Sequence, residues 1–296
     1  MTEIIQQLVN GLSLGATYSL VALGLAIVFT TFGLINFAHG ELITITSYVT
    51  YGLSVLGIPW AVAITGGLFT AIISAILMER IAFRPVRGKP PTTSLLTSFG
   101  VSLILQALIV IIVSPRTKTV QQWSWLGGSD IVGGLVFPRY QVITLVVALI
   151  ALLAMVFTLK KTNIGLEIRG AAEDLEGVRL LGVRSGRLVV VAFAVSGLLA
   201  GIAAVLIMAR TGGSINPHMG LLPMLSAFVA VVLGGFGSLG GAVLGGFILG
   251  FLEVSLRAWL PQSAVGLTTA IIFAIVILVL RIKPSGIMGK VIEEKV

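Results

Sequence analysis

The chain has 296 residues, of which 57% are hydrophobic and only 10% are charged, and its mean hydropathy is +1.11. A soluble domain carries about a quarter charged residues, so this composition excludes one and indicates a lipid bilayer. Zero cysteines and two histidines exclude disulfides and thiolate metal sites and leave too few ligands for a metal cage. The formal net charge of +8 reflects loop charges that set membrane orientation, so nucleic-acid binding is not expected.

Apolar runs close to the roughly 20 residues that a helix needs to cross a bilayer recur along the whole chain. A helix satisfies its backbone polar groups internally, so helices are expected in these runs. We predict an all-α polytopic membrane protein with about eight or nine transmembrane helices, some of them discontinuous, in one domain over residues 1–296. The expected spans are residues 8–30, 35–56, 60–80, 93–113, 140–159, 188–208, 221–234, 241–256 and 264–280.

The opening residues, MTEIIQQLVNGLSLG, lack the positive leading segment and the cleavage site of a secretory signal peptide. We therefore expect the first apolar run to remain in the mature chain. Glycines in this run and later ones follow small-xxx-small spacing, which lets helix backbones approach closely within lipid. The pairs are Gly11/Gly15, Gly197/Gly201, Gly241/Gly245 and Gly246/Gly250.

The stretch GLINFAHGE, residues 33–41, places Asn36, His39 and Glu41 in an otherwise apolar region. One interpretation is a helix start, with Asn36 as the cap and Glu41 favoured by the positive end of the helix. The other is that polar groups at membrane depth face a solute pathway and line it. The two interpretations are compatible. The stretch also leaves open whether residues 35–56 cross the membrane or enter and return.

Lys and Arg collect in alternate loops, which predicts orientation because cytoplasmic loops carry the positive excess. Residues 80–89, the loop 160–187 and the tail from Arg281 hold 14 of the 19 basic residues. We expect these segments and the C-terminus in the cytoplasm, and the loop 114–138 outside with Trp123 and Trp125 at the membrane interface. No Lys or Arg precedes Arg80, so the N-terminus lies outside only if residues 35–56 cross fully.

The cytoplasmic loop contains an amphipathic pattern over residues 171–181, with Leu175, Val178 and Leu181 at helical spacing. Gly182 is expected to end this helix. A compact, charged helix between two spans suits the docking of a cytosolic partner. It equally suits a solvated interfacial helix that positive charge anchors to the membrane.

The run GGFGSLGG, residues 234–241, holds five glycines in eight residues. Each glycine weakens a helix by about 1 kcal/mol relative to alanine, so a helix break is expected here. The flanking apolar runs are short for full spans, which is typical of discontinuous helices around a cavity. Residues 33–41 are the candidate counterpart of this run in an inverted repeat, although no residue-by-residue identity between the halves is evident.

No phosphate-binding loop of the form GxxxxGK[ST] is present, so we expect neither ATP hydrolysis nor any catalytic residue in this chain. Several stretches together resemble the integral membrane permeases of branched-chain amino-acid ABC importers. They are NGLSLGATYSLVALGLAIVF followed by GLINFAHGE, then GLEIRGAAEDLEGVRLLGV in the inner loop, and AFVAVVLGGFGSLGGAVLGGFILG late in the chain. Their order and spacing match the family across nearly the whole chain.

The resemblance implies one permease domain, with residues 160–187 as its cytoplasmic coupling loop, in the plasma or inner membrane of a prokaryote. It implies a second related permease or a second copy, two cytoplasmic ATPase subunits that use ATP and Mg, and a periplasmic or lipid-anchored solute-binding protein. No cofactor or metal is implied in this chain. The residues matching the translocation pathway are Asn36, Phe37, His39, Gly40, Glu41, Gly234, Gly235, Gly237, Ser238 and Gly240. Those matching the segment that docks on the ATPases are Gly170, Ala171, Ala172, Glu173, Asp174, Leu175, Leu181 and Gly182.

The sequence is also compatible with other functions. Related permeases move urea, short amides or other amino acids, and the sequence does not separate these substrates. An ion-coupled carrier also uses broken helices, but it needs membrane-embedded carboxylates, and only Glu41 and Glu253 lie near a span. Glu253 is expected to pair with Arg257, one helical turn later. A passive channel would leave the inner-loop helix unexplained.

Overall fold

A computed structural model describes residues 2–120, 126–132 and 135–289, so the expected interface residues Trp123 and Trp125 lie outside the described residues. Seven described helical segments are long and apolar enough to span a membrane, which confirms the all-α polytopic prediction. They are built on α1 (Thr2–Phe32), α3 (Trp60–Met78), α4 (Pro91–Ile112), α5 (Arg139–Lys161), α8 (Ser185–Arg210), α10 (Leu239–Trp259) and α11 (Thr268–Ile282). The π-helix η1 (Glu79–Phe83) and the 3₁₀ helix η2 (Arg84–Val86) continue α3, and the 3₁₀ helix η4 (Gln262–Leu267) precedes α11.

Four shorter helices complete the described fold. Two of them, α2 (His39–Val55) and α9 (Leu221–Gly234), lie in predicted spans, and α6 (Asn163–Glu173) and α7 (Leu175–Leu180) lie in the predicted cytoplasmic loop. The strands are short and antiparallel: β1 (Lys118–Thr119) pairs with β4 (Ser214–Ile215), and β2 (Ser129–Val132) pairs with β3 (Leu135–Pro138). At 1.5 Å per residue the 14 residues of α9 reach only roughly 21 Å, short of the roughly 30 Å of a bilayer core.

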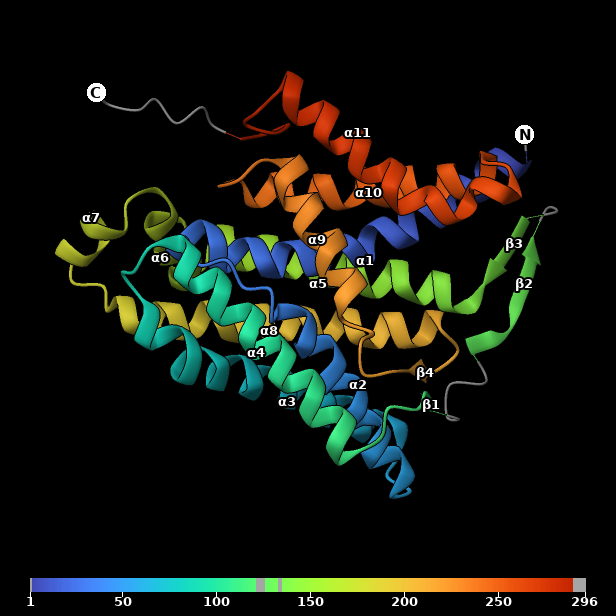
Figure 1. Cartoon of the computed structure of the whole chain (residues 1–296), viewed down its shortest axis with the longest axis horizontal. Helices are drawn as coiled ribbons and strands as arrows, with labels where there is room; N and C mark the ends of the chain where they lie inside the picture. The colour runs from blue at the N-terminus through green and yellow to red at the C-terminus, as the bar shows by residue number, and fades with distance from the viewer. Residues whose placement is uncertain (1, 121–125, 133–134, 290–296) are drawn as a thin grey trace.

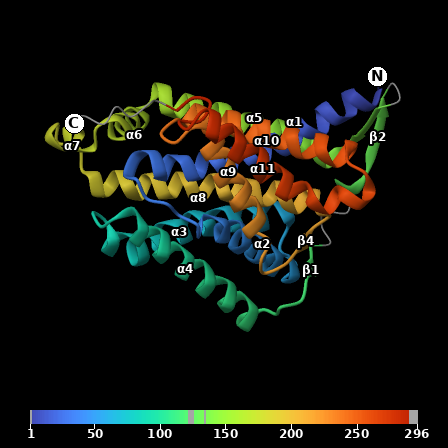
Figure 2. The ribbon, with the colours of Figure 1, turned by 45° about the horizontal axis from the view of Figure 1, so that its top comes forward.

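The segments rich in Lys and Arg gather at one end of the bundle. Figures 1 and 2 both show the α3–α4 connection, α6 with α7, and the segment after α11 at the left end. The N-terminus and both strand pairs lie at the opposite end. Residues 33–55 therefore run from one end to the other as a whole, as the crossing alternative requires, although their first part is not helical.

The buried centre of the fold is α1, which packs along α10 and also contacts α8, α9 and α5. Its most apolar stretch is almost entirely buried. Two of the predicted glycine pairs, Gly11/Gly15 and Gly246/Gly250, form the seam between α1 and α10, since a Cβ on Gly250 would strike the backbone of Gly15. A Cβ on Gly246 would lie 2.6 Å from Cα of Ser19. Small residues thus let two helices touch where lipid supplies no hydrophobic drive.

The predicted helix break at residues 234–241 is confirmed. The helix α9 ends at Gly234, and α10 begins at Leu239 after Ser238, whose Oγ accepts a hydrogen bond of 2.9 Å from the Gly241 N–H. Gly235 and Gly237 have φ values of 108° and 89°, a region that L-residues with side chains avoid. The glycine run therefore makes a tight turn between two helices.

Substitutions along the α1–α10 seam should destabilise the fold. We expect Gly250→Ala to lower the free energy of unfolding by roughly 1–3 kcal/mol, because its methyl group has no room beside Gly15. The measurement is the midpoint temperature of thermal unfolding in detergent, monitored as the loss of the monodisperse peak in size-exclusion chromatography.

Gly52→Ala is the matched control, since Gly52 lies within α2 and nothing lies within 4 Å of an added Cβ. This substitution should stabilise the helix by roughly 0.5–1 kcal/mol. Equal midpoints for the two variants would contradict the close packing of α1 on α10.

Candidate functional site

The polar stretch at residues 33–41 lies where α2 begins, away from both ends of the bundle (Figure 1). The N-cap of α2 is Ala38, and no side chain caps this helix, so the prediction that Asn36 is the cap was wrong. Asn36 is 1% exposed and donates a hydrogen bond of 3.6 Å to Sδ of Met78 on α3. Its amide therefore ties the segment before α2 to a neighbouring helix.

Glu41 lies in the first turn of α2, as predicted, and is 2% exposed. Its Oε1 accepts hydrogen bonds of 2.8 Å from Ser102 Oγ and 2.7 Å from Gln106 Nε2, both on α4. Gln106 Oε1 in turn lies 2.9 Å from Nδ1 of His218, an exposed residue in the segment before α9. A chain of hydrogen bonds thus leads from a buried carboxylate to an accessible imidazole.

His39 is fully buried at the same helix start. Its Nδ1 lies 3.1 Å from Oγ of Ser196 on α8, and its ring packs against Gly24 of α1, where a Cβ would lie 3.0 Å from His39 Cε1. His39 therefore joins α2 to two long helices. The imidazole is held inside the protein, not on an open surface.

Gly40 and Gly220 meet backbone to backbone where α2 and α9 begin. A Cβ on Gly40 would lie 2.5 Å from the carbonyl oxygen of Gly220, and a Cβ on Gly220 would strike the carbonyl group of Gly40. Each of these short helices is preceded by a non-helical segment that enters from one end of the bundle. The starts of two discontinuous helices therefore face each other within the fold.

The counterpart of residues 33–41 is the segment before α9, so the predicted pairing with residues 234–241 was wrong. The sequences TFGLINFAHG at 31–40 and TGGSINPHMG at 211–220 are identical at five of ten positions. In each, the glycine at the third position has a positive φ, 65° at Gly33 and 81° at Gly213. Each of the helices α1, α2, α3 and α4 also runs in the opposite direction to its counterpart, which is α8, α9, α10 or α11, respectively (Figure 1). An inverted repeat with residue identity is present after all.

The predicted glycines at the junction of α9 and α10 are not part of the contact between Gly40 and Gly220. Gly234 packs on Gly241, and Gly235 packs on the chain near Gly289. Aromatic rings connect this turn to the first segment: the Phe37 ring centroid lies 5.1 Å from that of Phe228, and the Phe228 centroid lies 6.2 Å from that of Phe236. The structure therefore separates the ten predicted pathway residues into two clusters joined by phenylalanines.

The predicted single helix over residues 171–181 is instead two helices, so that prediction was wrong. The chain leaves the helical conformation at Asp174 (φ −151°, ψ 97°), because its Oδ1 accepts a hydrogen bond of 2.9 Å from the Gly177 N–H and starts α7 anew. Gly182 follows α7 with a φ of 86°, which confirms the predicted end. The apolar residues left exposed are Leu180 and Leu181, at 90% and 84%, while Leu175 packs on the core.

Residues 7–280 match a family model described as branched-chain amino acid transport system / permease component. The chain belongs to this family of permease components. The high-affinity branched-chain amino acid transport system permease protein LivH of Salmonella typhimurium is 34% identical over 99% of this chain and 97% of its own length. The corresponding protein BraD of Pseudomonas aeruginosa is 33% identical over 99% of this chain and 98% of its own length. The permease is therefore a transporter subunit and not an enzyme.

The permease also resembles a solved structure in its fold. A chain of "PsaBC from Streptococcus pneumoniae in complex with Fab" aligns with a TM-score of 0.51 at 14% identity, over 93% of this permease and 91% of that chain. At this identity the likeness concerns the fold alone.

Four residues of the permease site were missed by the analysis of the sequence: Ser102, Gln106, His218 and Gly220. Ser102 and Gln106 lie on an apolar helix with no local motif, and only their contact with Glu41 reveals them. His218 and Gly220 could have been found from the sequence, because they lie in residues 211–220, which repeat the pattern of residues 31–40.

The hydrogen-bonded chain around Glu41 should contribute to stability. We expect Gln106→Leu to lower the free energy of unfolding by about 1–3 kcal/mol, because it removes a donor from a buried carboxylate. Thermal unfolding in detergent measures the change. Gln262→Leu, at an exposed position of η4, is the matched control and should leave the midpoint unchanged. The same midpoint for Gln106→Leu and the unmodified chain would show that this network contributes nothing.

Proposed function

We propose that this permease forms half of a membrane pore that imports branched-chain amino acids, driven by separate ATPase subunits and supplied by a solute-binding protein. The observation that carries the proposal is the meeting of two half-helices beside a polar network in a member of this family. Discontinuous helices of this kind expose backbone and polar groups to a solute. The relatives at 33–34% identity are named for branched-chain amino acids, which supports that substrate over urea, short amides or other amino acids.

The proposed route passes the accessible end of the polar network. His218 and Asn216 are exposed there, and Gln106 links His218 to Glu41, which is buried in this conformation. In this proposal the wall behind these exposed residues is formed by Asn36, Phe37, His39, Gly40 and Glu41. The segment between α9 and α10 borders the route through the ring of Phe236 and holds Gly234, Gly235, Gly237, Ser238 and Gly240. A second related permease, or a second copy, closes the other side.

The proposed contact with the ATPases is the tip of the cytoplasmic loop. Leu180, the last residue of α7, and Leu181 after it form an exposed apolar tip at the end of the bundle that carries most Lys and Arg. Such an exposed apolar pair favours burial against a partner. Gly170, Ala171, Ala172, Glu173, Asp174 and Leu175 form the base that holds this tip, with Gly170 packed on Val178. ATP and Mg are used in the partner subunits.

Charge supports an orientation with this end in the cytoplasm. The described parts of the three segments with most Lys and Arg lie together at this end, and the positive-inside rule favours the cytoplasm for such an end. The membrane in this proposal is the plasma membrane of a prokaryotic cell. The described C-terminal segment lies at the same end, and α1 begins at the opposite end, which this proposal assigns to the outside.

The carrier alternative is weakened by the partners of both carboxylates. Glu253 accepts a hydrogen bond of 2.6 Å from the Tyr18 hydroxyl and lies 2.7 Å from the Arg257 guanidinium, as its spacing predicted. Glu41 is held by Ser102 and Gln106. Neither carboxylate therefore stands in an open site of the kind that a coupling ion needs.

Orientation can be tested with single-cysteine variants, because the chain has no cysteine of its own. We expect a membrane-impermeant maleimide to label an Ile131→Cys variant in intact cells but to label Leu180→Cys only after permeabilisation. Both positions are well exposed, at 73% and 90%. Labelling of the Leu180→Cys variant in intact cells would place α7 outside and exclude docking to cytoplasmic ATPases.

Coupled transport is the direct test of the function. In vesicles that hold the permease with its ATPases and binding protein, uptake of labelled leucine should require ATP, and an ion gradient alone should not drive it. We expect Leu180→Asp with Leu181→Asp to reduce uptake at least about tenfold and to lose the ATPases on purification, because a charge enters an apolar contact. Glu41→Ala should reduce uptake similarly while the ATPases still copurify.

Ile131→Asp is the control for the docking variant, since it places a carboxylate at an exposed apolar position at the opposite end. It should keep both uptake and copurification of the ATPases. Uptake that proceeds without ATP on an ion gradient would replace the proposal with the carrier alternative.

A further inference from the structure

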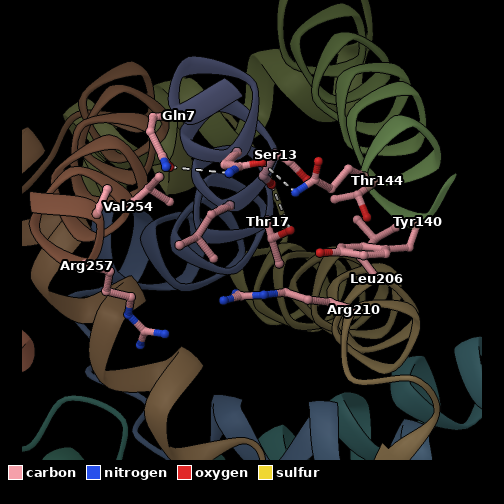
Figure 3. Close-up of a pocket in the computed structure, with 13 residues that line it drawn as sticks. Gln7, Ser13, Thr17, Tyr140, Thr144, Leu206, Arg210, Val254 and Arg257 are labelled. Atoms are coloured by element: carbon pink, nitrogen blue, oxygen red, sulfur yellow. Dashed lines mark hydrogen bonds between the residues drawn. The ribbon is translucent and has the colours of Figure 1, made fainter. Parts of the chain in front are cut away.

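A second polar site lies inside this single chain, apart from the helix-start network. A cavity of about 310 Å³ opens between α1, α5, α8 and α10 near the end of the bundle that holds the N-terminus (Figure 3). Binding sites for small molecules measure about 300–1,000 Å³, so a cavity of this size suits a small solute. Figure 3 shows side chains from all four helices around the space, among them Thr17, Thr144, Arg210 and Arg257.

The cavity contains one guanidinium group available to a ligand. Arg257 is paired with Glu253, at 2.7 Å, so its charge is already balanced. Arg210, the last residue of α8, forms no ion pair with any residue in the described part of the chain. It is solvent-accessible, and its donors suit a carboxylate.

The α5 wall of the cavity offers two buried oxygen atoms without a hydrogen-bond partner among the described residues. Gln141 and Thr144 on α5 are 8% and 3% exposed, and both line the cavity. The Gln141 amide donates to Oδ1 of Asn10 at 2.8 Å, but among the described residues neither Gln141 Oε1 nor Thr144 Oγ1 has a hydrogen-bond partner. Buried polar groups are normally satisfied, so these two oxygens are available to a donor that enters the cavity.

We propose that this cavity binds a free α-amino acid as a zwitterion, with its carboxylate on Arg210 and its ammonium group at Gln141 and Thr144. Leu14, Leu206 and Val254 line the same cavity and offer an apolar wall to a branched side chain. This inference rests on the proposed function, because it takes the transported solute as the ligand.

A zwitterion fits better than an anion alone. A simple carboxylate or phosphate would satisfy Arg210 but would leave the acceptor of Gln141 without a donor. Anionic lipid headgroups are recognised by clusters of about 4–8 Lys or Arg, whereas this cavity offers one guanidinium that is not already paired. Arg210 lies in the last turn of α8, where a positive charge also interacts favourably with the helix dipole. A measurement of ligand binding distinguishes this structural role from recognition of a ligand.

The test is binding of labelled L-leucine to the full-length permease in phosphatidylcholine nanodiscs without the binding protein. Two analogues separate the chemistry: 4-methylpentanoate lacks the amine, and 3-methylbutylamine lacks the carboxylate. We expect saturable leucine binding and at least about tenfold weaker binding of each analogue, since each leaves one wall unsatisfied. Equal binding of 4-methylpentanoate and leucine would replace the zwitterion site with a simple anion site.

Variants locate the ligand. Arg210→Gln should weaken leucine binding at least about tenfold without changing the affinity for 3-methylbutylamine, whereas Thr144→Val should weaken the amine without affecting 4-methylpentanoate. Arg116→Gln, at an exposed position outside the cavity, is the control and should bind leucine normally. Unchanged leucine binding by Arg210→Gln, absence of any leucine binding, or displacement of leucine by phosphatidylglycerol would overturn the proposal.

The same preparations separate this proposal from the proposed function. ATP-driven uptake by the unmodified transporter reports on the function and does not require the cavity to bind leucine. Absent uptake with leucine binding that still depends on Arg210 would remove the transport proposal alone. Normal uptake with leucine binding that Arg210→Gln leaves unchanged would remove the cavity site alone.

Discussion

Two helices begin inside this bundle, and their first turns meet backbone to backbone at Gly40 and Gly220. The first four N–H groups of any helix lack partners within the helix, and an unsatisfied group in hydrocarbon costs several kcal/mol. Such a start is tolerated only where protein covers it. The two starts cover each other, and only glycine leaves the space for this contact. The surrounding helices are arranged to enclose that junction.

The polar residues of GLINFAHGE hold the enclosure together. Asn36 reaches α3, His39 reaches α8 and packs on α1, and Glu41 reaches α4. Three side chains that look misplaced in an apolar sequence therefore each fix the start of α2 to a different helix. The same network ends at His218, outside the buried core, so one set of hydrogen bonds both positions the helix and presents a polar surface.

The sequence predicted long helices, the break after Gly234 and the positive end of the bundle, because these depend on local composition. It predicted the Glu253–Arg257 pair because that contact spans one helical turn. The partners of Glu41 could not be predicted, since Ser102 and Gln106 are distant in the chain and lie in an apolar helix. The break of the inner helix at Asp174 was missed because hydrophobic spacing continues through it, whereas the cap to Gly177 is a local hydrogen bond. The counterpart of residues 31–40 was predictable from its residue identities at 211–220, whereas the glycine run at 234–241 indicates only a helix break.

The seam between α1 and α10 determines how the chain can move. Helix α1 belongs to the first half of the repeat but is packed along helices of the second half, so the halves share one interior. The two halves cannot separate as rigid bodies without exposing the packed interface between α1 and α10. If the chain forms half of a pore as proposed, the switch between outward and inward access is then expected to come from the whole subunit tilting against the second permease. In that arrangement a force applied to α7 would move the whole subunit, and the gate would lie between two chains.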